Sequence, residues 1–397
     1  MFSGVFTLKI LIEFYCEENT KNISPLLYGD YDRVYFIGFD GEGADSRHAD
    51  VLDTLISSKF GAETVFLTVP DKTLSGAYRL LYELVGDGHE YVIDLTGGSE
   101  LFAAAAGIFA GTSERQNVSI ANYDINSGVQ YLQYPVLSEN AALHTLSADE
   151  LISLSGGAVI SKSMTYQRIN SNNALRAEIV RMWDTVKSIT ADWNRFCSMT
   201  NRREDRHVTK KLTRADDRKT CERLTGLMRR RGIIKNDVIY VDDKGKTYLE
   251  YDLCPRAKTT ELYEKSGTVL ELYACLAAGE SGAFTDAASG TLIDLDGLLS
   301  KSKGDPRNEI DLTAVYKNRL VLCSCKCTKP TKEHLYEILT MAEQYGGKYS
   351  IPVLICSEPA FEPVRERARE MGVILIDNVI NSTLKSFKSA FLQYFPV

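Results

Sequence analysis

The chain has 397 residues, 44% of them hydrophobic and 25% charged, with a formal net charge of −7 at pH 7. That length is too great for one ordinary hydrophobic core, so two or three domains are expected. No apolar run reaches the roughly 18 residues of a membrane helix, and Met1–Glu13 lacks the basic segment of a signal peptide. Nine cysteines without a disulfide spacing fit the reducing cytoplasm, so we expect a cytoplasmic protein with no membrane partner.

The first 140 residues alternate short apolar strands with amphipathic helices and form the first expected domain. Strands are expected at Leu8–Phe14, Val34–Phe39, Val65–Val69, Tyr91–Asp94 and Val118–Tyr123. Helices are expected between them at Ala49–Lys59, Leu74–Leu84 and Leu101–Ala110, and a hairpin-like segment at Gln130–Val136. This alternation predicts an α/β, Rossmann-like fold with a parallel, doubly wound sheet.

Residues 141–255 form a second region, which is rich in charge. Ser147 and Glu150 have capping-box spacing ahead of a short helix, and Gly156-Gly157 marks a junction. Two helices and a β-hairpin follow at Ala174–Ile189, Arg214–Arg231, Val238–Val241 and Thr247–Tyr251. Helices followed by a hairpin predict a linker and a small winged-helix-like module.

Residues 256–397 form the third expected domain. Val269, Leu272, Tyr273 and Leu276 recur at helical spacing and predict one apolar helix face. The segments that follow are three strands, an amphipathic helix through Leu335 and Ile338, and a last strand, at Thr291–Leu295, Glu309–Val315, Leu320–Lys326 and Ile351–Cys356. The predicted order is therefore αβββαβ.

Two of these strands carry acidic and basic side chains that are suited to phosphodiester hydrolysis. Period-2 alternation puts Glu309 and Asp311 on one face, and Ser324 and Lys326 on one face of the next strand. A lysine at the end of a buried strand needs a negative partner, and Asp311 is the natural one. Carboxylates bind Mg²⁺ or Mn²⁺, and a lysine steadies the attacking water or the phosphate. Glu271, on the preceding helix, is the third expected metal ligand beside Asp311 and Glu309.

These strands have two other interpretations. Glu309, Asp311 and Lys326 are also compatible with a solvated strand face that has no catalytic role. Cys323, Cys325 and Cys327 alternate along a strand roughly 6.6 Å apart, which is too far for three thiolates on one zinc ion, so we expect buried apolar thiols.

With this helix, strand and lysine pattern, residues Gly267–Ser357 resemble the PD-(D/E)xK nuclease superfamily. The resemblance implies a restriction-endonuclease-like fold and a metal-dependent nuclease. The family pattern places an acid two residues before the lysine, where this chain has Ser324. The departure removes one expected metal ligand, for which Glu309 would have to compensate.

A glycine turn, Asp94-Leu-Thr-Gly-Gly-Ser-Glu100, leaves the fourth expected strand and opens a helix. Glycines let a ligand approach the backbone, and a helix N-terminus favours anions. Many strand-to-helix turns carry two glycines for packing alone, so the turn by itself leaves both interpretations open.

Followed by a PD-(D/E)xK-like domain, this turn resembles that of the CARF (CRISPR-associated Rossmann fold) sensors of type III CRISPR immunity. The resemblance implies a homodimer that binds a cyclic oligoadenylate, usually cyclic tetra-adenylate, across its twofold axis. The ligand would then activate degradation of DNA, RNA or both. Carried over by position, the ligand-binding residues are Thr96, Gly97, Gly98 and Ser99, faced by Glu18 and Asn19.

A basic stripe occupies residues 201–235, where thirteen Lys and Arg residues accompany five Asp and Glu residues. In a chain of net charge −7, such a concentration is typical of a track for a phosphate backbone. A solvated helix face is the alternative. The residues expected to contact single- or double-stranded nucleic acid are Arg202, Arg203, Lys210, Lys211, Arg214, Arg229, Arg230 and Arg231.

The leading hypothesis is an allosteric, metal-dependent nuclease that a cyclic oligoadenylate switches on. The second is a non-enzymatic regulator, in which the sensor controls a nucleic-acid-binding module and a degenerate nuclease fold. The third is a first domain that itself cleaves its cyclic ligand.

Overall fold

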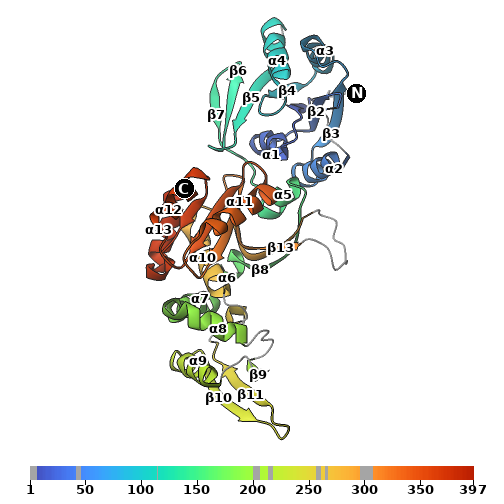
Figure 1. The fold of residues 1–397 in the computed structure, drawn as a ribbon. Helices are drawn as coiled ribbons and strands as arrows, with labels where there is room; N and C mark the ends of the chain where they lie inside the picture. The colour runs from blue at the N-terminus through green and yellow to red at the C-terminus, as the bar shows by residue number, and fades with distance from the viewer. Residues whose placement is uncertain are drawn as a thin grey trace.

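The computed structural model describes residues 7–41, 46–113, 115–199, 206–212, 218–255, 261–263, 267–295 and 307–397. Its described residues form three β-sheets of seven, three and six strands. Figure 1 shows the seven-stranded sheet and the three-stranded sheet at opposite ends of an elongated molecule, with the six-stranded sheet between them. Among the helices of these residues, none has the length and apolar character needed to cross a bilayer.

The first sheet has the order β3-β2-β1-β4-β5-β6-β7. Its strands are β1 (Lys9–Phe14), β2 (Arg33–Phe39), β3 (Glu63–Val69), β4 (Glu90–Asp94), β5 (Val118–Asp124), β6 (Val129–Tyr134) and β7 (Ser138–Asn140). The first five are parallel, and β6 and β7 add antiparallel strands at one edge. The predicted Rossmann-like sheet is therefore confirmed.

The two faces of this sheet pack against different helices. Alternate β1 residues such as Ile10 and Ile12 belong to a core with residues of α3 (Leu74–Leu84) and α4 (Glu100–Thr112). The other face is covered in part by α1 (Asn19–Ile23), the 3₁₀ turn Ser24–Tyr28, α2 (Ser46–Leu55) and the π-helical turn Ile56–Phe60. Strand alternation explains the division, since successive side chains point to opposite faces.

The small module has the antiparallel strand order β10-β11-β9. Its elements, with the helix that precedes them, are α7 (Asn173–Val186), the 3₁₀ turn Lys187–Ile189, α8 (Thr190–Met199), β9 (His207–Lys211), α9 (Arg218–Arg230), β10 (Ile234–Val241) and β11 (Thr247–Leu253). Trp193, Phe196, Leu224 and Tyr251 are buried together between its helices and its sheet. The predicted winged-helix-like arrangement of helices and a hairpin is confirmed.

The third sheet has the order β16-β15-β14-β13-β12-β8. Its strands are β8 (Ala158–Thr165), β12 (Asp286–Asp294), β13 (Arg307–Tyr316), β14 (Arg319–Lys326), β15 (Ile351–Cys356) and β16 (Ile374–Ile376). The helices around it are α5 (Ala148–Leu154), α6 (Tyr166–Asn170), α10 (Thr268–Ser281), α11 (Lys332–Gly346), α12 (Glu362–Glu370) and α13 (Leu384–Tyr394). From α10 to β15 the elements follow the predicted αβββαβ order.

The strand β8 comes from the region expected to be a linker. It pairs antiparallel with β12, where Lys162 lies opposite Thr291, and so forms one edge of the third sheet. The sequence of β8 does not alternate strongly between apolar and polar residues. Most of its side chains are at least partly exposed at the edge of the sheet, so few positions require an apolar residue. Two short 3₁₀ turns, Glu261–Tyr263 and Val379–Asn381, complete the described elements.

One hydrophobic cluster joins the first sheet to the third. It includes Leu11 and Ile23 from the first unit, Ile152 from α5, and Leu335 and Ile338 from α11, all less than 2% exposed. Lys59 and Glu150 form an ion pair of 2.8 Å across the same junction. A shared core makes these two units one packed body.

Candidate functional site

Asp311 and Ser324 face each other on the adjacent strands β13 and β14. The paired residues of these strands reach Leu312 opposite Cys323. Beyond that pair, the Asp311 carboxylate accepts the main-chain N–H of Cys325 at 2.7 Å and the Ser324 hydroxyl at 3.4 Å. The predicted proximity of Asp311 to the polar residues of the next strand is therefore observed.

Lys326 lies close enough to Asp311 for its charge to act on that carboxylate. Burial raises the pKa of Asp311 above its usual value, and the Cys325 N–H and the Lys326 charge oppose the rise. The Lys326 ammonium itself forms an ion pair of 3.3 Å with Glu337 of α11. Sequence reasoning missed Glu337, although its position on the polar side of α11 beside Ile338 was visible in the helical pattern.

The charges of Glu309 and Glu271 act on residues of this site. Glu309 is exposed on β13, and its negative charge raises the pKa of Asp311. Its carboxylate lies beside Gly290, where an added methyl carbon would stand 3.4 Å from Glu309 Oε1. Glu271 acts from α10, where its charge raises the pKa values of Cys325 and Cys327.

The three carboxylates expected to bind a metal do not form a metal-binding group. Within the described part of the chain, no three Asp, Glu, His or Cys side chains are arranged so that they could hold one ion. Ser324 lies where the resemblance to PD-(D/E)xK nucleases predicts an acid, and its hydroxyl donates to Asp311.

The cysteines beside this site are buried thiols. Cys323 and Cys325 are 1% and 7% exposed, and burial raises the pKa of each above its usual value. Neutral thiols in an apolar core are poor metal ligands and poor nucleophiles, which agrees with the expectation from spacing.

The glycine turn packs tightly on the end of β1. A methyl carbon on Gly97 would overlap the carbonyl oxygen of Phe14 and stand 2.8 Å from Glu13 Oε1, and Gly98 has φ of +75°. Thr96 is held on both sides, since its N–H donates to Asp94 and its hydroxyl oxygen accepts the N–H of Tyr123, each at 2.7 Å. Both glycines are therefore required by packing, whatever the turn binds.

A pair of buried acids lies directly beneath the turn. Glu13 of β1 and Asp94 of β4 are neighbours in register, and both are 0% exposed. Burial raises the pKa of Asp94 to about 7, and burial with the neighbouring Asp94 raises that of Glu13 well above its usual value. Two adjacent carboxyls without a cation between them cannot both be ionised, so the pair holds at least one proton near neutral pH.

Glu18 and Asn19 lie at the junction of the two larger units. Asn19 is 4% exposed, and its side-chain amide donates to the carbonyl oxygen of Leu154 in α5 at 2.9 Å. The Glu18 carboxylate lies over Gly347, where an added methyl carbon would stand 2.8 Å from Glu18 Oε1. These two side chains, predicted to face the ligand, contact the third-sheet unit.

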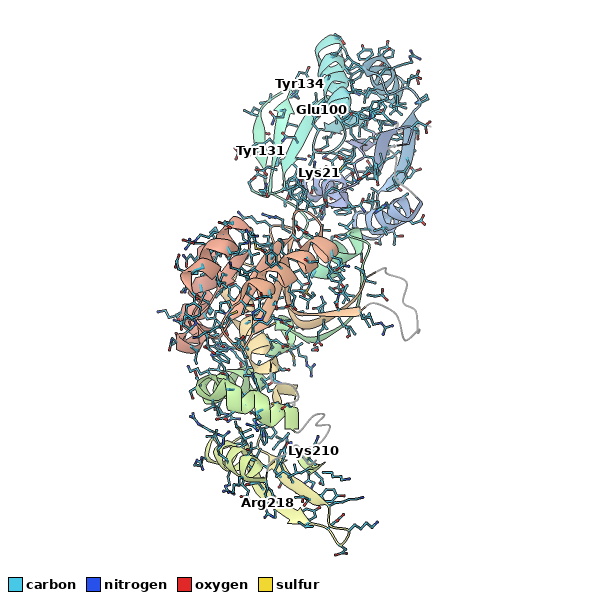
Figure 2. All side chains as sticks on the ribbon, viewed as in Figure 1. Lys21, Glu100, Tyr131, Tyr134, Lys210 and Arg218 are labelled. Carbon is cyan, nitrogen blue, oxygen red and sulfur yellow. The ribbon has the colours of Figure 1, made fainter. Side chains whose placement is uncertain are left out.

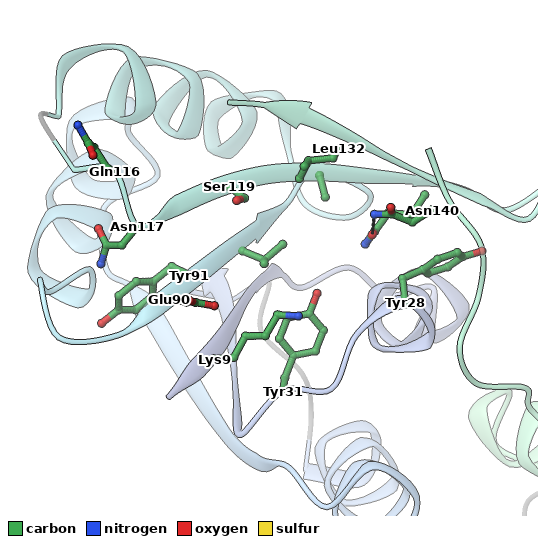
Figure 3. A pocket seen from close by; sticks show the side chains of 13 residues that line it. Lys9, Tyr28, Tyr31, Glu90, Tyr91, Gln116, Asn117, Ser119, Leu132 and Asn140 are labelled. Carbon is green, nitrogen blue, oxygen red and sulfur yellow. Dashed lines mark hydrogen bonds between the residues drawn. The ribbon is translucent and has the colours of Figure 1, made fainter. Parts of the chain in front are cut away.

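A polar groove of about 620 Å³ crosses the first sheet near the amino-terminal ends of β1, β4 and β5 (Figure 3). Figure 3 shows Lys9 beside Tyr31, with Tyr28 and Asn140 toward one end and Asn117 toward the other. The groove is separate from the glycine turn, which follows the carboxyl-terminal end of β4. No sequence motif marked it, because its residues come from six separate segments.

The basic residues of the small module lie far from the first sheet. In Figure 2, Lys210 and Arg218 are at one end of the molecule and Glu100 is near the other. Lys211, Arg230 and Arg231 are exposed, as is Arg229, which pairs with Asp237 at 2.8 Å. Arg202, Arg203 and Arg214 lie outside the described residues.

Comparison with known proteins identifies the fold. No protein-family model matches the chain, and no curated protein matches its sequence. The crystal structure of protein VC1899 from Vibrio cholerae matches with a TM-score of 0.71 at 16% identity, over 98% of both chains. The structure of Can2 from Sulfobacillus thermosulfidooxidans in complex with cyclic tetra-adenylate matches with a TM-score of 0.65 at 12% identity, over 98% of this chain and 100% of that one. The chain has the fold of these proteins from end to end.

Proposed function

We propose that the chain is a metal-dependent nuclease of type III CRISPR defence that is activated by a cyclic oligoadenylate. The proposed activator is cyclic tetra-adenylate. Its units would be a sensor at residues 1–140, a basic nucleic-acid-binding region at 141–255 and a nuclease at 256–397. The strand β8 would belong to the nuclease sheet, with which it pairs. The full-length match to a protein that binds cyclic tetra-adenylate supports the proposed activator.

The juxtaposition of Asp311 and Lys326 carries the nuclease proposal. Lys326 would neutralise negative charge on the scissile phosphate, and Asp311 would hold this end of β14 in place through the Cys325 N–H. Mg²⁺ or Mn²⁺ would supply an activated water when bound to Asp311, Glu309 and Glu271. Among the described residues these acids are not gathered into one ligand group, so the proposal requires them to come together when the metal binds.

The small module would hold the substrate by its phosphate backbone. Its exposed basic residues face solvent on β9 and α9, as such a track requires. Tyr240 and Tyr248 stack at 5.6 Å on the sheet, in register with Lys211, and offer bases an aromatic surface. These side chains support a non-specific contact with single- or double-stranded DNA or RNA.

A homodimer would place two copies of the glycine turn around one cyclic ligand. The helix α4, which begins at this turn, exposes Ala103, Ala104, Gly107 and Ile108 on one side, with Ile108 44% exposed. Small side chains permit close helix approach, which supports α4 as the contact between copies. Sedimentation of wild-type protein and of Ala104→Arg tests this, because a dimer built on α4 becomes a monomer in the variant.

A direct test of the proposal combines protein, Mn²⁺ and labelled single-stranded oligonucleotides, with and without cyclic tetra-adenylate. The proposal requires cleavage that needs both the activator and the metal. Cleavage of equal rate without activator would contradict the allosteric part, and cleavage in EDTA would contradict the metal part.

A second function is favoured by Ser324 and by the absence of a three-acid group among the described residues. The chain would then be a nucleotide-responsive regulator that binds nucleic acid without cutting it. Tight oligonucleotide binding that changes when the activator is added, without any cleavage in Mn²⁺, would support the regulator over the nuclease.

A further inference from the structure

The segment after β1 touches the glycine turn on one side and the nuclease unit on the other. Toward the turn, a methyl carbon on Gly97 would stand 3.5 Å from the Cys16 thiol, which leaves little free space between the two. The Cys16 main chain is tied to Asn22, which accepts the Cys16 N–H at 3.0 Å and donates to the Cys16 carbonyl at 2.8 Å. A shift of the turn toward β1 must therefore displace this segment.

Asn22 is hydrogen-bonded to Asn19 as well as to Cys16. Its side-chain amide donates to Asn19 Oδ1 at 3.1 Å, and Asn19 in turn donates to the Leu154 carbonyl at 2.9 Å. Both asparagines are buried, at 0% and 4% exposure, so water does not replace either bond at low cost. A continuous series of hydrogen bonds therefore links Cys16 to Leu154 through Asn22 and Asn19.

On the nuclease side, this series reaches the elements that carry the candidate site. Leu154 is the last residue of α5, which packs against both β14 and α11. Gly347, under the Glu18 carboxylate, ends α11, and Glu337 in the same helix pairs with Lys326. An α-helix of this length is about 22 Å long and moves as a unit.

We propose that Asn19 is the positioning residue that couples the state of the glycine turn to the Lys326 site. The proposal rests on the proposed function, because it assigns a role in activation. Displacement of the turn by a bound anion would shift Asn19, and α5 and α11 would follow because they share one core with it. Lys326 would then change its position relative to Glu337 and Asp311, and Asn19 would not touch the ligand itself.

The test compares full-length wild type with Asn19→Asp, which keeps the shape but replaces the donating amide with an acceptor. Asn19→Ala serves as a second variant in case a buried carboxylate prevents folding. Lys59→Met is the matched control, because it removes another contact at this junction that lies outside the hydrogen-bonded series. Each protein is assayed for cyclic tetra-adenylate affinity, for oligonucleotide cleavage, and for hydrogen exchange in α5 and α11.

In the Asn19 variants, we expect activator affinity within about threefold of wild type, with activated kcat at least tenfold lower and KM nearly unchanged. The activator-induced change in hydrogen exchange of α5 and α11 should also be lost, a readout that needs no cleavage. Lys59→Met should behave as wild type in all three assays. Undiminished activation and exchange changes in both Asn19 variants would overturn the coupling alone.

Two other results are also decisive. Parallel loss of activator binding and activation would show that Asn19 is a ligand residue, and would overturn the coupling role. Failure of wild-type protein to bind the activator would overturn the sensor half of the proposed function, and the coupling with it.

Discussion

The Asp311 carboxylate accepts the main-chain N–H of Cys325 at 2.7 Å, one residue before Lys326. This bond ties the candidate acid of β13 to the strand that carries the lysine, beyond the last paired residues of the two strands. It also fixes the Asp311 side chain beside Ser324, where the resemblance to PD-(D/E)xK nucleases predicts a second acid. The site therefore has an uncharged hydroxyl, which donates to Asp311, in place of a second negative charge.

Ser324→Asp should create the missing acid. Ser324 is 5% exposed beside Asp311, so a second carboxylate there should lower stability by roughly 1–3 kcal/mol in EDTA. Added Mn²⁺ should restore the melting temperature, because a cation bound only by the folded state stabilises it. Melting curves with and without Mn²⁺ measure this, with Ser324→Asn as the uncharged control. If the melting temperature of Ser324→Asp is the same with and without Mn²⁺, the result would argue against a metal site at this position.

Asp94→Asn should change how stability depends on pH. The folded-state pKa of Asp94, about 7, is above its usual value of 3.8, so the native state holds a proton that the unfolded state releases. Stability from this group is fully present below about pH 4 and is lost as pH rises through 7. The variant keeps an oxygen acceptor for the Thr96 N–H, so it should match wild type at about pH 3.5 and melt several degrees higher at pH 8. A difference independent of pH would contradict the buried acid pair.

Gly97→Ala should destabilise the unit of the first sheet by roughly 1–3 kcal/mol and weaken binding of the proposed activator at least tenfold. The added methyl overlaps the Phe14 carbonyl, so the turn must move away from β1. Thermal melting and activator titration measure the two effects. Gly88→Ala is the control, because nothing lies within 4 Å of its added methyl. Unchanged melting of Gly97→Ala would show that the turn has room for a methyl group beside the Phe14 carbonyl.

Replacement of Lys210 and Lys211 by alanine should weaken oligonucleotide binding uniformly across sequences. If both contact phosphates, the slope of log affinity against log salt should fall by about 2, roughly 1 per lysine. Titrations at several salt concentrations in EDTA measure the slope. The pair Lys332 and Lys348, on and just after α11, provides the control variant. An unchanged slope would exclude β9 from the nucleic-acid track.

Sequence patterns predicted much of the fold, because periodicity survives wherever one face of an element is buried. The helix Leu74–Leu84 and the strand Ile351–Cys356 were predicted with their observed bounds. The strand β8 was not predicted, because its pairing with β12 joins positions more than 120 residues apart and leaves no local trace. The helix α8 was missed because it follows α7 after a single 3₁₀ turn.

The candidate site was predictable only in part. Asp311, Ser324 and Lys326 were found because strand alternation places them on neighbouring strands. Glu337 was missed, since its approach to Lys326 depends on how α11 packs over β14. The contact of Asn19 with α5 was not predicted for a similar reason: position after a strand indicates an edge of the sheet, but not which neighbouring unit covers it.

The most direct test of the central claim is cleavage of a labelled single-stranded oligonucleotide by Asp311→Asn. Asparagine keeps an oxygen for the Cys325 N–H and removes only the charge, so the fold should persist. The account predicts activator- and Mn²⁺-dependent cleavage by wild type, and a rate at least 100-fold lower in the variant at equal melting temperature. Equal cleavage by the two proteins would show that the Asp311–Lys326 site does not cut nucleic acid.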